Sequence, residues 1–248
     1  MGTAGNKAAE YKTAAIVLAA GQGRRMNSQV QKQYLMLGEY PVIYYSLRAF
    51  EQSFVDEVVL VTGALEQEYC RKEIVEKYGF TKVRSIVAGG KERYHSVANG
   101  LRALKDCDYV FIHDGARPFL TQDILKRAYE TVVQEKACVV GMPVKDTIKL
   151  ADENGYAQTT PRRDLVWQIQ TPQVFACDLI WKAYEKFLEQ EQTLEEQGVR
   201  MTDDAMVAEY FAGVKVRLVE GSYENIKLTT PEDFKIAAGL TENFTESF

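Results

Sequence analysis

The sequence predicts an α/β protein built on a mostly parallel, twisted sheet that helices cover on both faces. Apolar β-type segments alternate with amphipathic helical segments from residue 14 to residue 144, which is typical of crossover units between parallel strands. The 248 residues are 46% hydrophobic, which is enough for a sizeable core. No repeat or linker interrupts the pattern, so we expect one domain over 1–248.

The alternating segments define the expected elements in chain order. We expect helices between successive strands, and the helix over 93–104 illustrates why. Its Val97, Leu101 and Leu104 recur at helical spacing and form one apolar stripe, which leaves the opposite face for function. The strands are expected at 14–20, 55–63, 82–89, 108–115 and 137–144, and the helices at 41–50, 65–79, 93–104 and 121–135.

The pattern changes after residue 144. Two short polar and apolar runs flank Asn154 and Gly155, a dipeptide that favours a β-hairpin because both turn positions tolerate positive φ. We therefore expect a β-hairpin arm that projects from the sheet as an insertion at about 146–172.

The last part of the chain returns to ordinary elements. A helix over 229–240 is expected to begin with Thr230 as N-cap and Pro231 as first residue, with Asp233 in the position of a capping box. Before it, we expect helices over 181–198 and 203–213 and short strands over 215–221 and 224–228.

Composition excludes several classes of protein. A formal charge of −5 argues against a broad nucleic-acid-binding surface. No apolar run is long enough to span a membrane, and the polar first residues lack a signal-peptide pattern, so we expect a soluble, cytoplasmic protein. The four cysteines form no CxxC pair, and we expect ordinary, partly buried thiols at Cys70, Cys107, Cys138 and Cys177.

A glycine-rich turn follows the first expected strand, in the stretch AAGQGRRM at 19–26. Met26 stands where the dinucleotide fingerprint has its third glycine, and no GK[ST] ending follows, so neither common phosphate motif is present. Glycines still let backbone N–H groups approach a phosphate, and Arg25 and Lys32 add positive charge at the carboxyl end of a parallel strand. Taken alone, the motif is more typical of a tight turn carrying solvated cations than of a phosphate site.

A second polar cluster ends another strand, in FIHDGARPF at 111–119. Asp114 is a hard oxygen ligand suited to Mg²⁺, which often binds one or two carboxylates together with substrate phosphates. Arg117 adds a cation nearby. Alone, His113 and Asp114 are also typical of a strand end and a capped turn. Together with the glycine-rich turn on a separate strand end, they favour a phosphate site.

These residues carry a family resemblance. AAGxGxRM followed by KQY resembles the nucleotide-binding signature of sugar-nucleotide-type nucleotidyltransferases. HDGARP is similar to the signature of the 2-C-methyl-D-erythritol 4-phosphate cytidylyltransferase family. The likeness extends along nearly the whole chain through VAGGKERYHSV, VKDTIK, QTPQVF, TDDA and VEGSYENIKLTTPEDF.

The resemblance implies a Rossmann-like fold and a homodimer paired through the arm. It also implies that CMP is transferred from CTP to 2-C-methyl-D-erythritol 4-phosphate with release of pyrophosphate, in non-mevalonate isoprenoid synthesis. Mg²⁺ or another divalent cation would be the cofactor. A pentitol-phosphate cytidylyltransferase acting on ribitol 5-phosphate is the alternative enzyme, and a CTP-binding module without turnover is the non-enzymatic one.

Roles for individual residues come from the same resemblance. Arg25 and Lys32 would stabilise the transition state at the α-phosphate, and Arg163 and Lys227 would position the acceptor phosphate. Asp114 would hold the metal ion. The residues implied in CTP binding are Ala19, Ala20, Gly21, Gly23, Gly90, Ser96, Asp114 and Arg117. Those implied in contact with the polyol phosphate are Thr171 and Thr202.

Three positions depart from the family pattern. Gln31 stands where the family often has proline, Lys91 where an acidic residue is common, and Gly115 where alanine is frequent. None of them removes a reacting group. The attacking phosphate is already ionised near neutral pH, so no general base is needed and we expect His95 and His113 to be structural.

Overall fold

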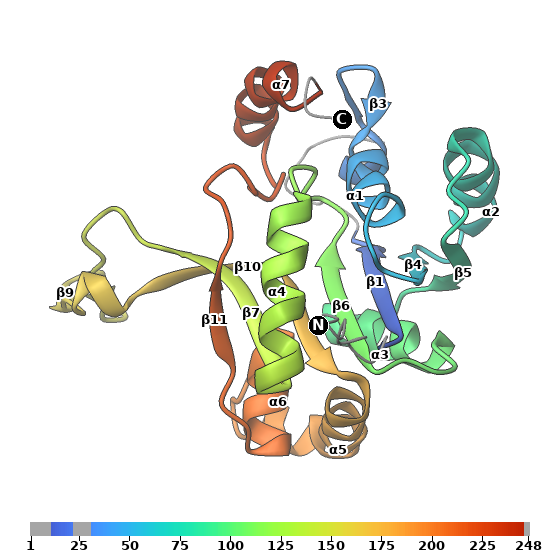
Figure 1. Cartoon of the computed structure of the whole chain (residues 1–248). Coiled ribbons are helices and arrows are strands. Elements are labelled where there is room, and N and C mark those ends of the chain that lie inside the picture. Colours follow the sequence, from blue (N-terminus) through green and yellow to red (C-terminus); the bar gives the residue numbers. More distant parts are fainter. Residues whose placement is uncertain (1–10, 22–30, 246–248) are drawn as a thin grey trace, which may run out of the picture.

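A seven-stranded sheet forms the centre of the computed structural model, which describes residues 11–21 and 31–245 (Figure 1). Its order is β11-β7-β10-β6-β1-β4-β5. β10 runs antiparallel to both neighbours and every other pair is parallel, which confirms the predicted, mostly parallel sheet. The strands are β1 (Thr13–Ala19), β4 (Glu57–Thr62), β5 (Val83–Ala88), β6 (Tyr109–Asp114), β7 (Ala137–Pro143), β10 (Trp167–Ala176) and β11 (Arg217–Glu220).

Helices cover both faces of this sheet. Successive strand residues point to opposite faces, so Val17 of β1 joins one buried cluster and Ile16 joins the other. The first cluster includes residues of α1 (Val42–Glu51), α4 (Gln122–Glu135) and α7 (Pro231–Thr245). The second includes residues of α3 (Arg93–Ala103), α5 (Cys177–Glu196) and α6 (Asp204–Ala212). The predicted α/β layering is confirmed.

The strand order creates a switch point between β1 and β6. From β1 the chain moves outward to β4 and β5, and then returns to β6 on the other side of β1. The two strands are parallel and in register, with Leu18 opposite Asp114, so both end at the same edge of the sheet. Open α/β sheets bind their ligands in the crevice at such a point.

Short elements connect the strands of the first half. A 3-10 turn, η2 (Lys32–Tyr34), and a small ribbon of β2 (Met36–Leu37) with β3 (Tyr40–Pro41) lead into α1. The helix predicted over 65–79 consists of a short α2 (Gln67–Tyr69) that continues as a π-helical segment, η3 (Cys70–Glu76).

The predicted hairpin arm is also confirmed. β8 (Leu150–Ala151) pairs antiparallel with β9 (Ala157–Thr159), and Gly155 has a φ of +85° in the turn between them. The hairpin extends away from the central sheet (Figure 1). After a 3-10 turn, η4 (Arg163–Leu165), the chain rejoins the sheet, where Trp167 at the start of β10 pairs with Pro143 of β7.

The start of α7 agrees with the sequence prediction. The helix begins at Pro231, and Asp233 Oδ2 accepts hydrogen bonds from the backbone N–H groups of Thr229 and Thr230 at 2.7 and 2.8 Å. None of the helices described is both long enough and apolar enough to cross a membrane.

The strand predicted over 224–228 is wrong. Turn-type hydrogen bonds shape this segment, from Asn225 N–H to the Ser222 carbonyl and from Ile226 N–H to the Glu224 carbonyl. The buried Asn225 side chain donates to the Thr171 carbonyl at 2.9 Å. Residues 225–228 alternate between polar and apolar, but such a pattern favours a strand only where a neighbouring strand offers a ladder, and no described strand pairs with this segment.

The expectation of four free thiols is wrong for two of them. Cys107, in the loop before β6, forms a disulfide with Cys177 at the start of α5, with the Cα atoms 6.1 Å apart. The fold brings together two positions that are 70 residues apart in the sequence, and such a separation carries no spacing signal. Cys70 and Cys138 are free and buried.

Candidate active site

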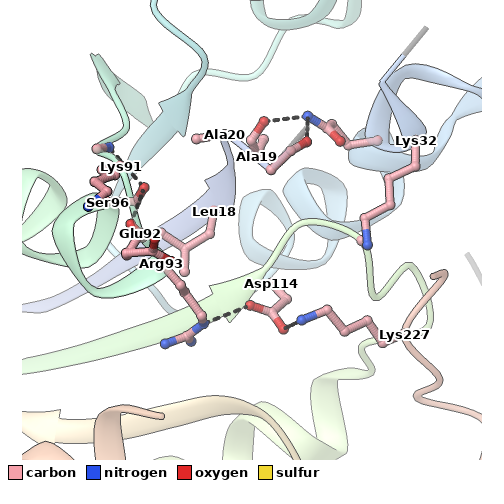
Figure 2. A pocket seen from close by; sticks show the side chains of 14 residues that line it. Leu18, Ala19, Ala20, Lys32, Lys91, Glu92, Arg93, Ser96, Asp114 and Lys227 are labelled. Carbon is pink, nitrogen blue, oxygen red and sulfur yellow. Dashed lines mark hydrogen bonds and ion pairs between the residues drawn. The ribbon is translucent and has the colours of Figure 1, made fainter. Parts of the chain in front are cut away.

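A pocket of about 410 Å³ lies at the switch point (Figure 2). Three segments line it: residues 18–21 at the end of β1, residues 32–33 of η2, and residues 90–93 with Ser96 at the start of α3. Asp114, Ala116 and Lys227 complete the lining. The pocket therefore occupies the edge where the glycine-rich turn and the HDGARP motif were expected to meet.

Most of the predicted site residues are brought together here. Arg117 lies directly behind the lining, with its Nε 3.9 Å from Asp114 Oδ2. Gly23 and Arg25 lie outside the described residues, and their roles stay predictions. The predicted residues that line the pocket are Ala19, Ala20, Gly21, Lys32, Gly90, Ser96, Asp114 and Lys227.

Asp114 is the electrostatic centre of the pocket. Lys227 Nζ lies 2.7 Å from its Oδ2, and Arg93 Nε lies 3.3 Å from its Oδ1 (Figure 2). Burial alone would raise the pKa of this carboxyl, but the Lys227, Arg93 and Arg117 cations hold it well below its usual range. Asp114 is therefore an ionised carboxylate at any pH near neutrality. We call Asp114 with these three cations the Asp114 corner.

Arg93 is a functional candidate that the sequence reasoning missed. Its Nη1 and Nη2 donate to the two carboxylate oxygens of Asp204, both at 2.8 Å, and the Tyr184 hydroxyl donates to Asp204 Oδ1 at 2.6 Å. Burial disfavours the charged guanidinium, yet Asp204 and Asp114 raise the pKa of Arg93 above its ordinary value. The motifs GGKER and TDDA contained both residues, but nothing in either motif indicates that they pair.

A chain of hydrogen bonds fixes Asp114 from behind. Its backbone N–H donates to Thr171 Oγ1 at 3.0 Å, the Thr171 hydroxyl pairs with His113 Nδ1 at 3.1 Å, and His113 Nε2 lies 3.2 Å from the Arg117 carbonyl. A carbonyl only accepts, so Nε2 carries the proton and Nδ1 accepts from Thr171. Burial lowers the pKa of His113 to about 4, which keeps the ring neutral. The hydroxyl of Thr171, expected to contact the polyol phosphate, is thus engaged within the protein.

The segment that carries Lys227 is held in place although it is not a strand. Arg117 Nη1 donates to the Asn225 carbonyl at 2.8 Å, and the Leu228 backbone N–H donates to the Ala116 carbonyl at the same distance. These bonds attach the segment to the HDGARP turn. Lys227 therefore reaches Asp114 from a backbone that is fastened on both sides of it.

Lys32 approaches the pocket from the opposite wall (Figure 2). Its neighbour Gln33 is buried, and the Gln33 amide donates to the carbonyls of Ala19 and Gly21 and to Gln31 Oε1. Gln31 in turn donates to Glu66 Oε1 at 2.6 Å. Gln31, which stands where the family often has proline, thus helps to join the turn that bears Lys32 to the end of β1.

The third wall depends on close backbone approach. Gly90 N–H donates to Ser96 Oγ at 3.1 Å, and the Ser96 hydroxyl donates to the Glu92 carbonyl at 3.3 Å. A Cβ on Gly90 would collide with the His95 side chain, so only glycine fits this backbone. The wall presents the backbone at Gly90 and the short Ser96 side chain to a ligand, beside the charged side chains of Lys91, Glu92 and Arg93.

Two predicted residues lie away from the pocket of their own chain. Thr202 is exposed just before α6, and its hydroxyl lies 3.9 Å from Met206 Sδ. Arg163 is exposed in the arm, where its Nη1 donates to the Lys145 carbonyl at 3.3 Å. Neither residue lines the pocket.

The pocket suits a divalent cation that arrives with a phosphate ligand. In the described part of the chain, no group of three or more His, Cys, Asp or Glu residues lies close enough to hold a metal ion by itself. Mg²⁺ commonly binds one or two carboxylates and takes its other ligands from substrate phosphates and water. Asp114 is ionised, and within the described part of the chain its Oδ1 has the comparatively long 3.3 Å Arg93 contact, so this donor set fits such an ion.

Comparisons with known proteins agree on one family. The model of the 2-C-methyl-D-erythritol 4-phosphate cytidylyltransferase family matches residues 13–242. A protein of that name from Lachnospira eligens is 53% identical over 224 residues, covering 90% of this chain and 96% of its own length. One from Lachnoclostridium phytofermentans is 46% identical over 229 residues, with 92% and 96% coverage.

Solved structures give the same result. The crystal structure of a 4-diphosphocytidyl-2C-methyl-D-erythritol synthase from Anaerococcus prevotii matches with a TM-score of 0.81 at 35% identity, covering 94% of this chain and 97% of that one. A 2-C-methyl-D-erythritol 4-phosphate cytidylyltransferase from Thermus thermophilus matches with a TM-score of 0.69 at 26% identity, with 93% and 99% coverage.

Proposed function

The chain belongs to the 2-C-methyl-D-erythritol 4-phosphate cytidylyltransferase family, and we infer from its pocket how it transfers CMP from CTP to that acceptor. The reaction joins the acceptor phosphate to the α-phosphate of CTP and releases pyrophosphate. The product is a precursor in the non-mevalonate route to isoprenoids.

The charge of the pocket is the observation that carries this function. Lys32, Lys91, Arg93 and Lys227 line it, against Glu92 and Asp114, although the chain as a whole has a net charge of −5. Local positive charge in a protein that is acidic on average attracts a highly charged anion to one place. CTP and a sugar-alcohol phosphate are both such anions.

The chemistry requires alignment and charge neutralisation. An oxygen of the acceptor phosphate attacks the α-phosphorus of CTP, the bond between that phosphorus and the α–β bridging oxygen breaks, and that oxygen leaves with pyrophosphate. The attacking oxygen is already ionised, so no general base is needed. Lys32 and, from the family resemblance, Arg25 would stabilise the charge that grows on the α-phosphate oxygens, and Lys227 would hold the acceptor phosphate for in-line attack.

Asp114 would hold the divalent cation at the triphosphate. When bound, Mg²⁺ would neutralise phosphate charge and orient the triphosphate. The Lys227 ammonium, now on Asp114 Oδ2, lies where it can serve both the carboxylate and an incoming phosphate. The glycine-lined walls at Gly21 and Gly90 allow backbone N–H groups to approach the nucleotide.

The exposed position of Arg163 favours a homodimer. We expect the arm of a second copy to bring Arg163 of the partner subunit to the acceptor phosphate, since the Arg163 of the same chain does not line the pocket. Isologous pairing through the arm would build two equivalent sites.

The finding that no described helix can span a membrane is consistent with an enzyme of the cytoplasm.

A pyrophosphate-release assay tests the function directly. CTP, ATP and UTP are each offered with 2-C-methyl-D-erythritol 4-phosphate or ribitol 5-phosphate, with Mg²⁺ and with excess EDTA. We expect turnover only with CTP and the methylerythritol phosphate, and none in EDTA. Turnover with ribitol 5-phosphate alone would assign the pentitol enzyme, and CTP binding by calorimetry without turnover on either acceptor would indicate a binding module.

A further inference from the structure

Asp204 is a buried charge that the chemistry above does not use. Its side chain is 0% exposed, and it lies outside the pocket at the start of α6. Its neighbour Asp203 caps α6 by accepting from Met206 N–H at 2.9 Å and also accepts from the Gln173 amide at 3.0 Å. Gln173 of β10 accepts in return from Ala205 N–H at 2.8 Å. The backbone around Asp204 is therefore fastened to the central sheet.

Arg93 divides its donors unequally between two carboxylates. Both Nη atoms bond to Asp204 at 2.8 Å. Only Nε faces Asp114, at 3.3 Å, and Figure 2 shows this contact. A bidentate pair of this kind fixes the plane and direction of the guanidinium. The shorter contacts hold Arg93 toward the buried side, so its charge is matched mainly by Asp204 and only its edge reaches the pocket.

This division matters because Asp114 already has other cations. Lys227 lies 2.7 Å from Oδ2 and Arg117 lies 3.9 Å from the same oxygen. A third fully available cation would cover Oδ1 as well and would compete with any metal ion for the carboxylate. Among the contacts of the described residues, Oδ1 has the long Arg93 contact at 3.3 Å, whereas Oδ2 has the closer Lys227 ammonium.

We propose that Asp204 is a positioning residue for the transfer reaction: it holds the Arg93 guanidinium on the buried side and so leaves Asp114 Oδ1 available to a divalent cation bound with CTP. This inference rests on the proposed CTP- and cation-dependent function. Without the Asp204 charge, Asp114 becomes the nearest carboxylate to Arg93. The guanidinium then turns toward Asp114 and the triphosphate, where it takes the place of the cation.

The test is the degree to which Mg²⁺ tightens CTP binding. Calorimetry without acceptor, so that no turnover occurs, gives the dissociation constant for CTP in EDTA and in saturating Mg²⁺. The ratio of the two measures the coupling between metal and nucleotide. In Asp204→Asn this ratio is expected to fall about tenfold, because freed Arg93 strengthens CTP binding in EDTA and weakens metal binding at Asp114. A fall of less than about threefold overturns the proposal.

Two variants separate this role from simple structural support. The double variant Arg93→Gln/Asp204→Asn removes both charges, and its coupling ratio should return to at least about the wild-type value if Asp204 acts through Arg93. A ratio as low as in the single variant contradicts the proposal. Tyr184→Phe removes one hydrogen bond to Asp204 and keeps every charge, so it should lower the melting temperature with the ratio within about threefold of wild type.

Loss of one partner from a buried ion pair is destabilising, so each protein is first checked by circular dichroism. If Asp204→Asn does not fold, Asp204→Ser replaces it, since the smaller side chain leaves room for water at the guanidinium, and the same fall in the ratio is expected. Wild-type turnover distinguishes the two levels of failure. If the wild type does not convert CTP and the methylerythritol phosphate, the function is wrong; if it does and the ratio is unchanged in the Asp204 variant that folds, only this inference fails.

Discussion

The Asp114 corner and the hairpin arm differ in how complete they are within one chain. In the corner, Asp114 has 10% side-chain exposure and lies among three cations that come from different parts of the sequence. In the arm, Arg163 is exposed, and the only hydrogen bond described for its side chain goes to the Lys145 carbonyl. Both regions carry residues that the family resemblance assigns to phosphate handling.

The difference indicates two ways of building a phosphate site. The Asp114 corner is preorganised, because its charges are fixed by one another within the chain, and such sites need little rearrangement during reaction. The proposed acceptor side would need a second surface to meet the arm. Substitutions in the corner should therefore have large effects within one chain, whereas those in the arm should act between chains.

Removal of the shared anion should have the largest effect. In Asp114→Asn, Lys227, Arg93 and Arg117 lose their common counter-charge. The proposed divalent cation would lose its carboxylate as well. We expect kcat/KM to fall about 10³-fold, or about 4 kcal/mol of transition-state stabilisation. Steady-state pyrophosphate release measures it, with Asp123→Asn, an exposed position on α4, as control. Activity above a tenth of wild type would show that the corner is not preorganised around this carboxylate.

Acidification should weaken the same corner through His113. Its pKa is about 4 in the folded protein against an ordinary 6.5, so the unfolded chain takes up a proton first as the pH falls. The contribution of His113 to the free energy of unfolding is therefore fully present above pH 6.5 and decreases between pH 6.5 and 4. By pH 4 about 3 kcal/mol of it is lost. Asp114 has a pKa below its ordinary value, so its own contribution is lost only at still lower pH.

Denaturant unfolding at several pH values between 7 and 4 measures this dependence. In His113→Gln the decrease from this residue should be absent, because the amide can still donate to the Arg117 carbonyl but does not titrate. His95→Gln is the matched control, since the chain has two histidines and His95 is only partly buried. Equal pH dependence of the wild type and His113→Gln would contradict the prediction.

The sequence predicts the charged residues of the pocket better than it predicts the segments and side chains that hold them in place. Asp114 and Lys32 follow directly from motifs at strand ends, because the edge position of a strand end is a local property. The antiparallel β10 and the turn around Asn225 were missed, since each depends on what the rest of the chain places beside it. Asp204 was missed for the same reason: its partner Arg93 is 111 residues away.

The variant Lys32→Ala tests the catalytic role of the pocket wall opposite the Asp114 corner. Lys32→Ala should lower kcat at least about 10²-fold, or about 2.7 kcal/mol, because it removes charge stabilisation that acts mainly in the transition state. The KM for CTP should change little. Lys126→Ala, an exposed lysine on α4, is the control. A kcat within a few fold of wild type would remove Lys32 from the proposed chemistry.

The variant Arg163→Ala tests the role of the arm, where the smallest effect on catalysis is expected. Arg163→Ala should raise the KM for the methylerythritol phosphate about tenfold, or about 1.4 kcal/mol, and leave CTP binding unchanged, since one charge-assisted contact to a phosphate is lost. Arg162→Ala is a close control because its guanidinium is paired with Asp164 at 2.5 Å. Equal effects of the two variants would show that the arm contributes only general positive charge.

A mixture of two variant chains then shows which subunit supplies Arg163 to each site. If each site combines Lys32 of one chain with Arg163 of the partner subunit, a mixed dimer of Lys32→Ala and Arg163→Ala chains has one intact site and one doubly altered site. Random exchange makes about half of the dimers mixed, so activity at low acceptor concentration should rise to about a quarter of wild type. If Arg163 serves its own chain, every site in the mixture carries a defect and no activity is regained, because mixing chains cannot bring the two intact residues into one site.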